Sequence, residues 1–453
     1  MSANWTPLNG LNQMAPRSYN RFALCFSVEN SKISEAVKHL KLCVAKLSKA
    51  CPALASLLMV NTPTACIKQI PGGKIPVEDL DDVGRLIRIT YAKLQKEGFP
   101  ASYFVHDVFD ISSDNEIPAL IVRIYRLDGG LILGLHLHHS FGDGHELRTL
   151  IRWLSAESRG DTVNYGPISF SVPLHGLLKI MEGECVNDLP EWKLRSRLGE
   201  PTEERAGEIF RFDLKELEAI RNGIGEGTST NIVLAALTWA HATKARFDSL
   251  RISKGTTGRD DRQIGDKSRL LIPVDVRKRV FQEKDIDQYF GNATELSLSC
   301  IDTNELLKAC ERTIGYKDEP DEVSKRMKPL TRHIQEAIAH VNPNFVKKRL
   351  SLYNQESDPR KFEHDADLSD RNAFIFNYWR YIGNDEMWDL NKTGPRYPDC
   401  GRRIGGQWNG PAGVVMPQLP KKDHLEVMIT LERSALSMLK GDRVFGELAK
   451  WDA

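Results

Sequence analysis

The fold is decided by the stretch Leu131-Ile-Leu-Gly-Leu-His-Leu-His-His-Ser-Phe-Gly-Asp-Gly144. Leucines occupy alternate positions at its start, the pattern of a β-strand whose successive side chains point to opposite faces. Gly142 and Gly144 allow a sharp turn, and apolar residues at helical spacing follow between Glu146 and Leu154. We therefore expect a buried strand that delivers two adjacent histidines to a turn at the start of a helix.

His139 is the candidate general base of this turn. If the strand continues that far, His139 points with the leucines and His138 points with His136. A neutral imidazole near pH 7 is suited to take a proton from a hydroxyl or an amine. Asp143 can lock the turn by pairing with a cation or with backbone N–H groups. The alternative is a structural histidine that is hydrogen-bonded in the core.

The same segment also allows a metal site. His136 and His138 share one face of the strand, and with Asp143 they supply two imidazoles and a carboxylate, a set that suits iron or zinc. The chain has no further His or Cys cluster with ligand spacing. A metal-dependent oxygenase or hydrolase is therefore an alternative function, and His145 is expected to be a solvated residue at the helix start.

The heptapeptide from His138 to Gly144 resembles the HHxxxDG signature of the CoA-dependent BAHD acyltransferases and of the related condensation domains. Other segments follow in the family's order, and they are more similar to fungal members than to plant ones. These segments are Phe22–Ser27 with Cys51–Leu54, Thr228–Asn231, Val274–Arg279 with Tyr289–Ala293, and Asn377–Trp379 with Asp389. One segment departs from the family, because its D-F-G-W-G motif is Asp389-Leu-Asn-Lys-Thr393 here, without the Phe-Gly or the Trp.

The resemblance implies an α/β fold of two chloramphenicol-acetyltransferase-like domains that form a pseudo-dimer with a tunnel between them. Strands and helices mix in both halves of the chain, as this fold requires. Residues 1–190 form the expected first domain and residues 206–453 the second. The aperiodic segment at about 155–205, rich in Gly and Pro, is the expected connection.

The resemblance also implies a reaction. An acyl group, most simply acetyl, moves from acyl-CoA to a hydroxyl of a small-molecule natural product in fungal secondary metabolism, and transfer to an amine stays open. His139 is the general base, and the indole N–H of Trp379, with Asn377 beside it, is the candidate donor to the oxyanion. Acyl-CoA is a cosubstrate, and no permanently bound cofactor is expected.

The remaining site residues follow from the same motifs. Asp143, Gly144 and Arg277 are expected to support the site, with Asp143 paired to Arg277; otherwise Arg277 to Arg279 reads as a solvated basic patch. Ser229 and Asn231 are ordinary helix-cap residues first. The candidates for contact with substrate or CoA are His138, Ser229, Asn231, Arg279 (or Lys278) and Asp389.

The altered segment after Asp389 keeps a third class of function open. In that alternative the acyltransferase scaffold is repurposed: it only binds an intermediate, or it uses His139 for cyclisation or thioester release. Binding of CoA separates the two readings, because a protein that never binds CoA belongs to this class or takes its acyl group from a carrier protein.

Composition excludes several classes of partner. Of 453 residues, 62 are basic and 61 acidic, for a formal net charge of +1, so neither nucleic acid nor an anionic membrane is an expected partner. No signal peptide is expected, and no apolar run approaches the roughly 20 residues of a membrane-spanning helix. The eight cysteines form no C-x-x-C pair, which favours a reducing cytoplasmic compartment without structural zinc. A covalent pseudo-dimer makes a monomer the expected state.

Periodicity predicts most secondary structure. The expected strands include 21–27, 120–125, 131–137, 207–212, 270–274, 294–299, 374–378, 413–416 and 425–430. The expected helices include 31–47, 79–96, 213–221, 228–245, 305–314, 323–341 and 434–439.

Overall fold

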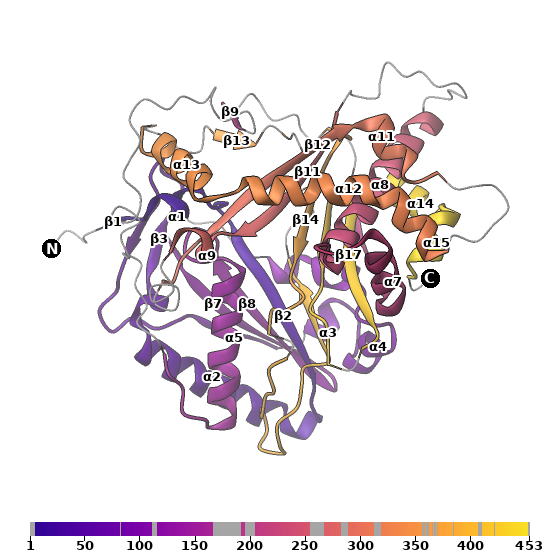
Figure 1. Ribbon diagram of the computed structural model, residues 1–453. Helices are drawn as coiled ribbons and strands as arrows, with labels where there is room; N and C mark the ends of the chain where they lie inside the picture. Colours follow the sequence, from indigo (N-terminus) through magenta and orange to yellow (C-terminus); the bar gives the residue numbers. More distant parts are fainter. Residues whose placement is uncertain are drawn as a thin grey trace.

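The computed structural model shows two layered α/β units joined along one chain (Figure 1). It describes residues 5–81, 83–110, 116–165, 192–194, 204–253, 267–281, 289–311, 319–355, 358, 362–364, 366, 368, 370–383, 385–405, 410–420 and 422–451. Much of the connection expected at 155–205 lies outside these residues, so the proposed domain boundary there stays a prediction.

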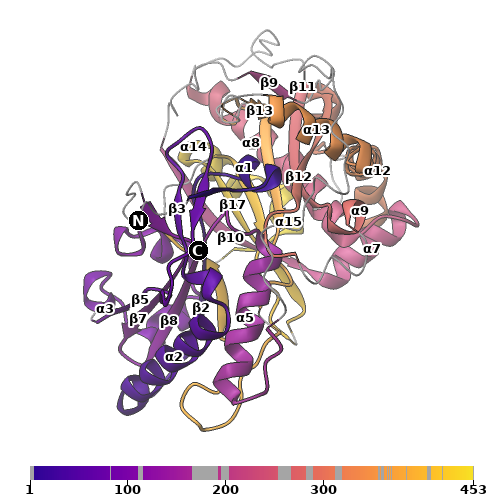
Figure 2. The ribbon, with the colours of Figure 1, turned by 90° about the vertical axis from the view of Figure 1, so that its left-hand side faces the viewer.

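The first unit is built on a five-stranded sheet of order β15-β2-β8-β7-β5. Its strands are β2 (Tyr19–Ser27), β5 (Val77–Leu80), β7 (Leu120–Leu127), β8 (Gly130–His138) and β15 (Cys400–Arg403). Strands β7 and β8 form an antiparallel hairpin, and β2 lies antiparallel to β8 with Phe22 opposite Leu135. Helices α2 (Asn30–Ala50) and α5 (Gly144–Arg159) lie together against the first unit (Figure 2).

All nine residues of β8 are buried because both faces of the sheet are covered. The leucines of β8 join a core cluster that includes the apolar stripe of α2, whereas Ile132 packs with Tyr125 and Ile404 in a second cluster on the opposite face. The alternation expected from the sequence is therefore present. The strand ends where the two units meet, because the next residue, His139, lines a cavity to which both units contribute.

The second unit is built on a six-stranded sheet of order β10-β17-β16-β14-β11-β12. Its strands are β10 (Arg205–Asp213), β11 (Lys267–Asp275), β12 (Thr294–Asp302), β14 (Ala373–Tyr378), β16 (Ala412–Val415) and β17 (His424–Glu432). Strand β14 runs parallel to both β11 and β16, and the other pairs are antiparallel. Helices α8 (Thr230–Ser253), α12 (Pro320–His340) and α14 (Arg433–Gly441) pack against this sheet (Figure 1).

The two units share one core along the second sheet. Val415 and Val427 belong to the cluster under the helices, whereas Val414 and Met428, one position along each strand, belong to the main cluster of the first unit. Because neighbouring strand residues face opposite sides, one face of this sheet packs on its helices and the other on the first unit.

Shorter elements complete the described structure. They are β1 (Thr6–Pro7), α1 (Gly10–Met14), β3 (Leu57–Met59), β4 (Cys66–Lys68), α3 (Val83–Leu86), α4 (Tyr91–Lys96), β6 (Glu116–Pro118), β9 (Trp192–Leu194), α7 (Leu214–Ile224), α9 (Arg277–Val280), α11 (Thr303–Lys308), α13 (Pro343–Gln355), β13 (Phe362–His364) and α15 (Arg443–Leu448), with 3₁₀ turns at Pro52–Ala55, Ala101–Val105 and Asp107–Phe109.

Two expected helices differ from the structure. The helix predicted for residues 79–96 is a strand end, β5, followed by the short helices α3 and α4. Glu78 and Asp79 of β5 form ion pairs with Arg123 and Arg126 of the neighbouring strand β7. Such tertiary pairing overrides local helical spacing. The helix expected to reach about residue 314 is α11, which ends at Lys308.

No helix among the described residues is long and apolar enough to cross a membrane. The described cysteines are free thiols; they are Cys25, Cys43, Cys51, Cys66, Cys300, Cys310 and Cys400. Cys185 lies outside the described residues.

Candidate functional site

The candidate site is the turn between β8 and α5. Strand β8 ends at His138, His139 is the first residue beyond it, and α5 begins at Gly144. Asp143 is the N-cap of α5, and its carboxylate accepts the backbone N–H of His145 at 3.0 Å. The chain thus turns within five residues, which places His139 next to the start of a helix.

Asp143 forms a buried ion pair with Arg277 from α9. The Arg277 Nη1 lies 3.0 Å from Asp143 Oδ2, and Nη2 lies 3.1 Å from Oδ1, so the contact is two-pronged. Both side chains are almost fully buried. Burial alone raises the pKa of Asp143, but the charge and hydrogen bonds of Arg277 lower this pKa to about 2. The contact expected between these residues is present, and it ties the two units together.

Asp143 also fixes the segment before β12. Its Oδ2 accepts the backbone N–H of Ala293 at 2.9 Å and the hydroxyl of Thr294 at 3.0 Å. The neighbouring Asn292 donates its side-chain amide to the backbone carbonyl of His139. It also donates its backbone N–H, at 2.7 Å, and its side-chain amide, at 3.0 Å, to Asn12 Oδ1. The network therefore holds the backbone of His139 rather than its ring.

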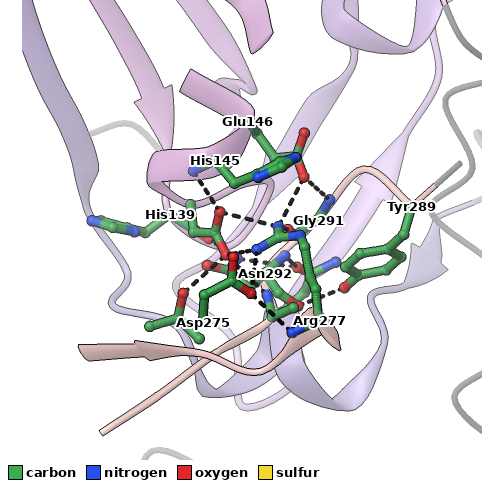
Figure 3. Close-up of polar contacts among 12 residues, drawn as sticks. His139, His145, Glu146, Asp275, Arg277, Tyr289, Gly291 and Asn292 are labelled. Atoms are coloured by element: carbon green, nitrogen blue, oxygen red, sulfur yellow. Dashed lines mark hydrogen bonds and ion pairs between the residues drawn. The ribbon is translucent and has the colours of Figure 1, made fainter. Parts of the chain in front are cut away.

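The ring of His139 points away from Arg277 and Glu146 (Figure 3). The Asp143 carboxylate binds Arg277, the N–H of Ala293 and the hydroxyl of Thr294 instead, so this carboxylate and the ring of His139 are not arranged as in a catalytic triad. Burial lowers the pKa of His139, and the negative charge of Asp143 only partly opposes that shift. At pH 7 the imidazole is therefore neutral and able to accept a proton.

His139 opens onto a cavity of about 580 Å³, a size typical of small-molecule sites. Both units line the cavity, and its wall includes His139, His145, Asn377 and Trp379. The backbone N–H of Trp379 donates to the carbonyl of Val415 at 2.9 Å, and its ring lies edge-on to Phe22 with centroids 6.1 Å apart. The structure therefore brings the three expected catalytic residues to one cavity.

The other expected contact residues lie elsewhere. Among the described residues that line this cavity, Ser229, Asn231, Arg279 and Asp389 are absent. Ser229 accepts the N–H of Ile232 at 3.3 Å, as a helix cap does, and the Arg279 guanidinium binds the carbonyls of Ile338 and Val341. The Asp389 side chain accepts the N–H of Gly394 at 3.4 Å. Contact of these residues with substrate or CoA stays a prediction.

The two histidines of the possible metal site are buried and contact their neighbours in the core. His138 accepts the N–H of Ser140 at 3.1 Å, its ring packs edge-on to Tyr19, and burial lowers its pKa to about 3. His136 lies 3.4 Å from the hydroxyl of Tyr125. Within the described ranges no three His, Cys, Asp or Glu side chains form a group that could hold a metal, and Asp143 is committed to Arg277.

Sequence reasoning missed two residues of the cluster, Asn292 and Glu146. Asn292 lies inside the segment from Tyr289 to Ala293 that matched the family, so its position had a signal although its contact with His139 did not. Glu146 had none, because a glutamate in the first turn of a helix is usually a solvated residue that complements the helix dipole. Here Glu146 is only 2% exposed.

Comparisons with known proteins agree with this architecture. The model described as the Transferase family matches residues 100–359, more than half of the chain. The model described as the trichothecene 3-O-acetyltransferase-like N-terminal domain matches residues 18–157.

Two curated relatives match part of the chain. Acyltransferase easC of Emericella nidulans is 24% identical over 288 residues, 54% of this chain and 59% of that protein. Trichothecene 8-O-acetyltransferase of Fusarium sporotrichioides is 21% identical over 309 residues, 59% of this chain and 62% of that protein. The chain thus spans about six-tenths of the length of these relatives.

Two solved structures share the fold along the whole chain. TRI101 of F. graminearum, complexed with coenzyme A and T-2 mycotoxin, superposes with a TM-score of 0.76 at 17% identity and covers 100% of both chains. Vinorine synthase superposes with a TM-score of 0.62 at 16% identity, covering 100% of this chain and 95% of that one. The expected α/β class is confirmed.

Proposed function

This chain belongs to the Transferase family, the BAHD-type acyltransferases, and we propose that it transfers an acyl group from acyl-CoA to a hydroxyl of a small molecule. The single observation that carries the proposal is the cavity between the units, onto which a half-buried, neutral His139 opens. The curated relatives are named as an acyltransferase and an O-acetyltransferase. Both names support acyl transfer, and the second supports oxygen as the accepting atom and acetyl as the acyl group.

His139 acts as the general base. It removes the proton of the acceptor hydroxyl as that oxygen attacks the thioester carbonyl, and it returns the proton to the departing CoA thiolate. The tetrahedral intermediate forms directly between the two substrates, so no Ser or Cys nucleophile is needed. A base of this kind contributes about 10²- to 10⁴-fold to the rate.

Alignment of two substrates in one cavity supplies the other large part of catalysis. Well-oriented reactants avoid an entropic cost worth about 7–11 kcal/mol of the barrier. Trp379 and Asn377 line the same cavity as His139, and their side-chain N–H groups are the donors that we assign to the oxyanion. Apolar residues such as Leu296 and Ile382 shield these bonds from bulk water, which strengthens them.

The direct test is acceptor-dependent release of CoA thiol. The purified chain is mixed with acetyl-CoA and a panel of polyol, terpenoid and alkaloid alcohols, and each product is identified by mass. Thiol release with an acetylated product supports the proposal. Release in the absence of any acylated product would show thioester hydrolysis instead, which the proposed reaction does not include.

The segment after Asp389 favours testing one alternative, a scaffold that binds an intermediate or cyclises it without using CoA. In place of the family motif, Leu390 is buried against the first unit and the preceding Trp388 packs edge-on to Phe26. A calorimetric titration with CoA separates the alternatives, because saturable binding is required only by the acyl-transfer reaction.

We also propose that the chain works as a monomer in the cytoplasm. The shared core between the two units already supplies the interface that a dimer would provide, and the described cysteines are free thiols, as in reducing compartments. Light scattering coupled to size-exclusion chromatography tests the first statement, and cell fractionation tests the second.

A further inference from the structure

Glu146 is a buried carboxylate beside the site that the proposed reaction does not use. It lies on the first turn of α5, three residues after Asp143. Its Oε1 accepts Arg277 Nη2 at 2.8 Å and the backbone N–H of Gly291 at 3.4 Å (Figure 3). One guanidinium therefore contacts two buried carboxylates at once.

These contacts lead to the backbone of His139. Arg277 Nη2 also donates to the carbonyl of Gly291 at 2.7 Å. Together, Glu146 and Arg277 therefore bind both the backbone N–H and the backbone carbonyl of Gly291. The next residue, Asn292, donates its amide to the carbonyl of His139. Glu146 thus holds the backbone of Gly291, and the next residue, Asn292, holds the backbone of the general base.

We propose that Glu146 is a positioning residue: its carboxyl group holds the Gly291–Asn292 turn and, through that turn, the backbone position of His139. The kinetic consequences of this inference rest on the proposed function. Its consequences for folding stability do not.

The charges around Glu146 favour the neutral form. Burial raises the pKa of Glu146 to about 8, the anion of Asp143 adds to that rise, and Arg277 opposes it. The titratable and charged groups around this site are Asp143, His145, Asp275, Arg277 and Tyr289. Asp275 is half exposed and so weakly coupled, which leaves Arg277 as the cation that balances Asp143.

Loss of the Glu146 proton would put a second negative charge in the dry cluster and draw Arg277 away from Asp143. The folded-state pKa of about 8 lies above the ordinary value of 4.5. The folded chain therefore binds more protons than the unfolded chain between these values. Stability must fall as pH rises through this window, most steeply below pH 8.

Two variants of the full chain test the inference. Glu146→Gln keeps the size and the acceptor oxygen but has no proton to lose, and Glu146→Leu removes the acceptor. The matched control is Glu157→Gln, a buried glutamate at the other end of α5 that pairs with the exposed Lys46. Unfolding in urea is followed from pH 5 to 9, and kcat and KM for acetyl-CoA are measured by thiol release.

In the wild type the unfolding free energy should fall as pH rises, with a slope that corresponds to about one bound proton. Glu146→Gln should lose this part of the slope, whereas Glu157→Gln should keep the wild-type slope. Glu146→Gln should also keep its kcat from pH 7 to 9, where the wild type loses activity. Glu146→Leu should lower kcat about 10- to 100-fold, with a much smaller change in KM, because the base is displaced while the CoA contacts remain.

If the unfolding free energy of Glu146→Gln depends on pH as steeply as that of the wild type, Glu146 is not neutral in the folded chain. An undiminished kcat in Glu146→Leu would overturn the positioning role. If the wild type releases no thiol with any acceptor, the proposed function fails. The urea measurement still decides the protonation of Glu146 in that case.

Discussion

At the scale of single residues, the protonation of His139 sets the acid limit of the reaction. Burial lowers its pKa below the ordinary value of 6.5, and only the neutral ring can accept a proton. We predict that log kcat/KM against pH bends downward at a midpoint below 6.5. A rate profile measured from pH 4.5 to 8 checks this, and a midpoint at 7 or above would contradict the assigned base. Because the unfolded chain protonates this histidine first, folding stability also falls as pH drops below about 6.5.

Arg277 is the residue on which the site depends most. Removing one partner of a buried ion pair typically costs about 3–5 kcal/mol, so Arg277→Ala should lower both the free energy of unfolding and the activity. Arg332→Ala removes an exposed arginine paired with Glu336 and should change stability little. Chemical unfolding with parallel assays checks both variants. A stable Arg277→Ala protein with full turnover would exclude the role.

Sequence alone reached this pair but not its surroundings. The family resemblance of the segments around Asp143 and Arg277 implied their contact. Glu146, Asn292 and Asn12 come from segments whose meeting depends on the three-dimensional path of the chain. No local pattern distinguishes a buried glutamate in a first helical turn from a solvated one.

At the scale of elements, the turn between β8 and α5 depends on the absence of a side chain at Gly142. A Cβ there would lie 2.9 Å from Glu146 Cβ and 3.0 Å from Leu137 Cδ2. We predict that Gly142→Ala lowers the free energy of unfolding by about 1–3 kcal/mol, the usual cost of overpacking, and lowers kcat. Gly441→Ala is the control, since a Cβ there meets nothing within 4 Å. Equal stability of the two variants would show that the turn has room to relax.

Elements with strong periodicity were predicted well, and the failure at residues 79–96 is instructive. The leucine alternation of β8 and the buried stripe of α2 are each decided by one face of one element. Strand β5 is instead decided by its parallel pairing with β7 and by ion pairs such as Asp79 with Arg126. A short edge strand of this kind carries too few residues for a periodic signal.

At the scale of the whole molecule, strand β15 crosses from the second unit into the sheet of the first. Cys400 lies opposite Cys25 on β2, and Ile404 is fully buried in a cluster of the first unit. We predict that residues 1–203 alone do not unfold cooperatively, because β2 then has an unpaired edge and the core lacks these side chains. Circular dichroism during urea unfolding tests this, with co-expressed residues 204–453 as the rescue. A cooperative transition in the isolated fragment would contradict the interdependence of the units.

The most direct test of the account is the turnover of His139→Ala beside the wild type with acetyl-CoA and one acceptor that the wild type acylates. His333→Ala, a helix residue of α12, serves as the histidine control. We predict that kcat falls about 10²- to 10⁴-fold in His139→Ala, while CoA affinity and unfolding midpoint stay close to those of the control. Turnover that survives the His139 substitution would contradict the central claim that this residue is the general base.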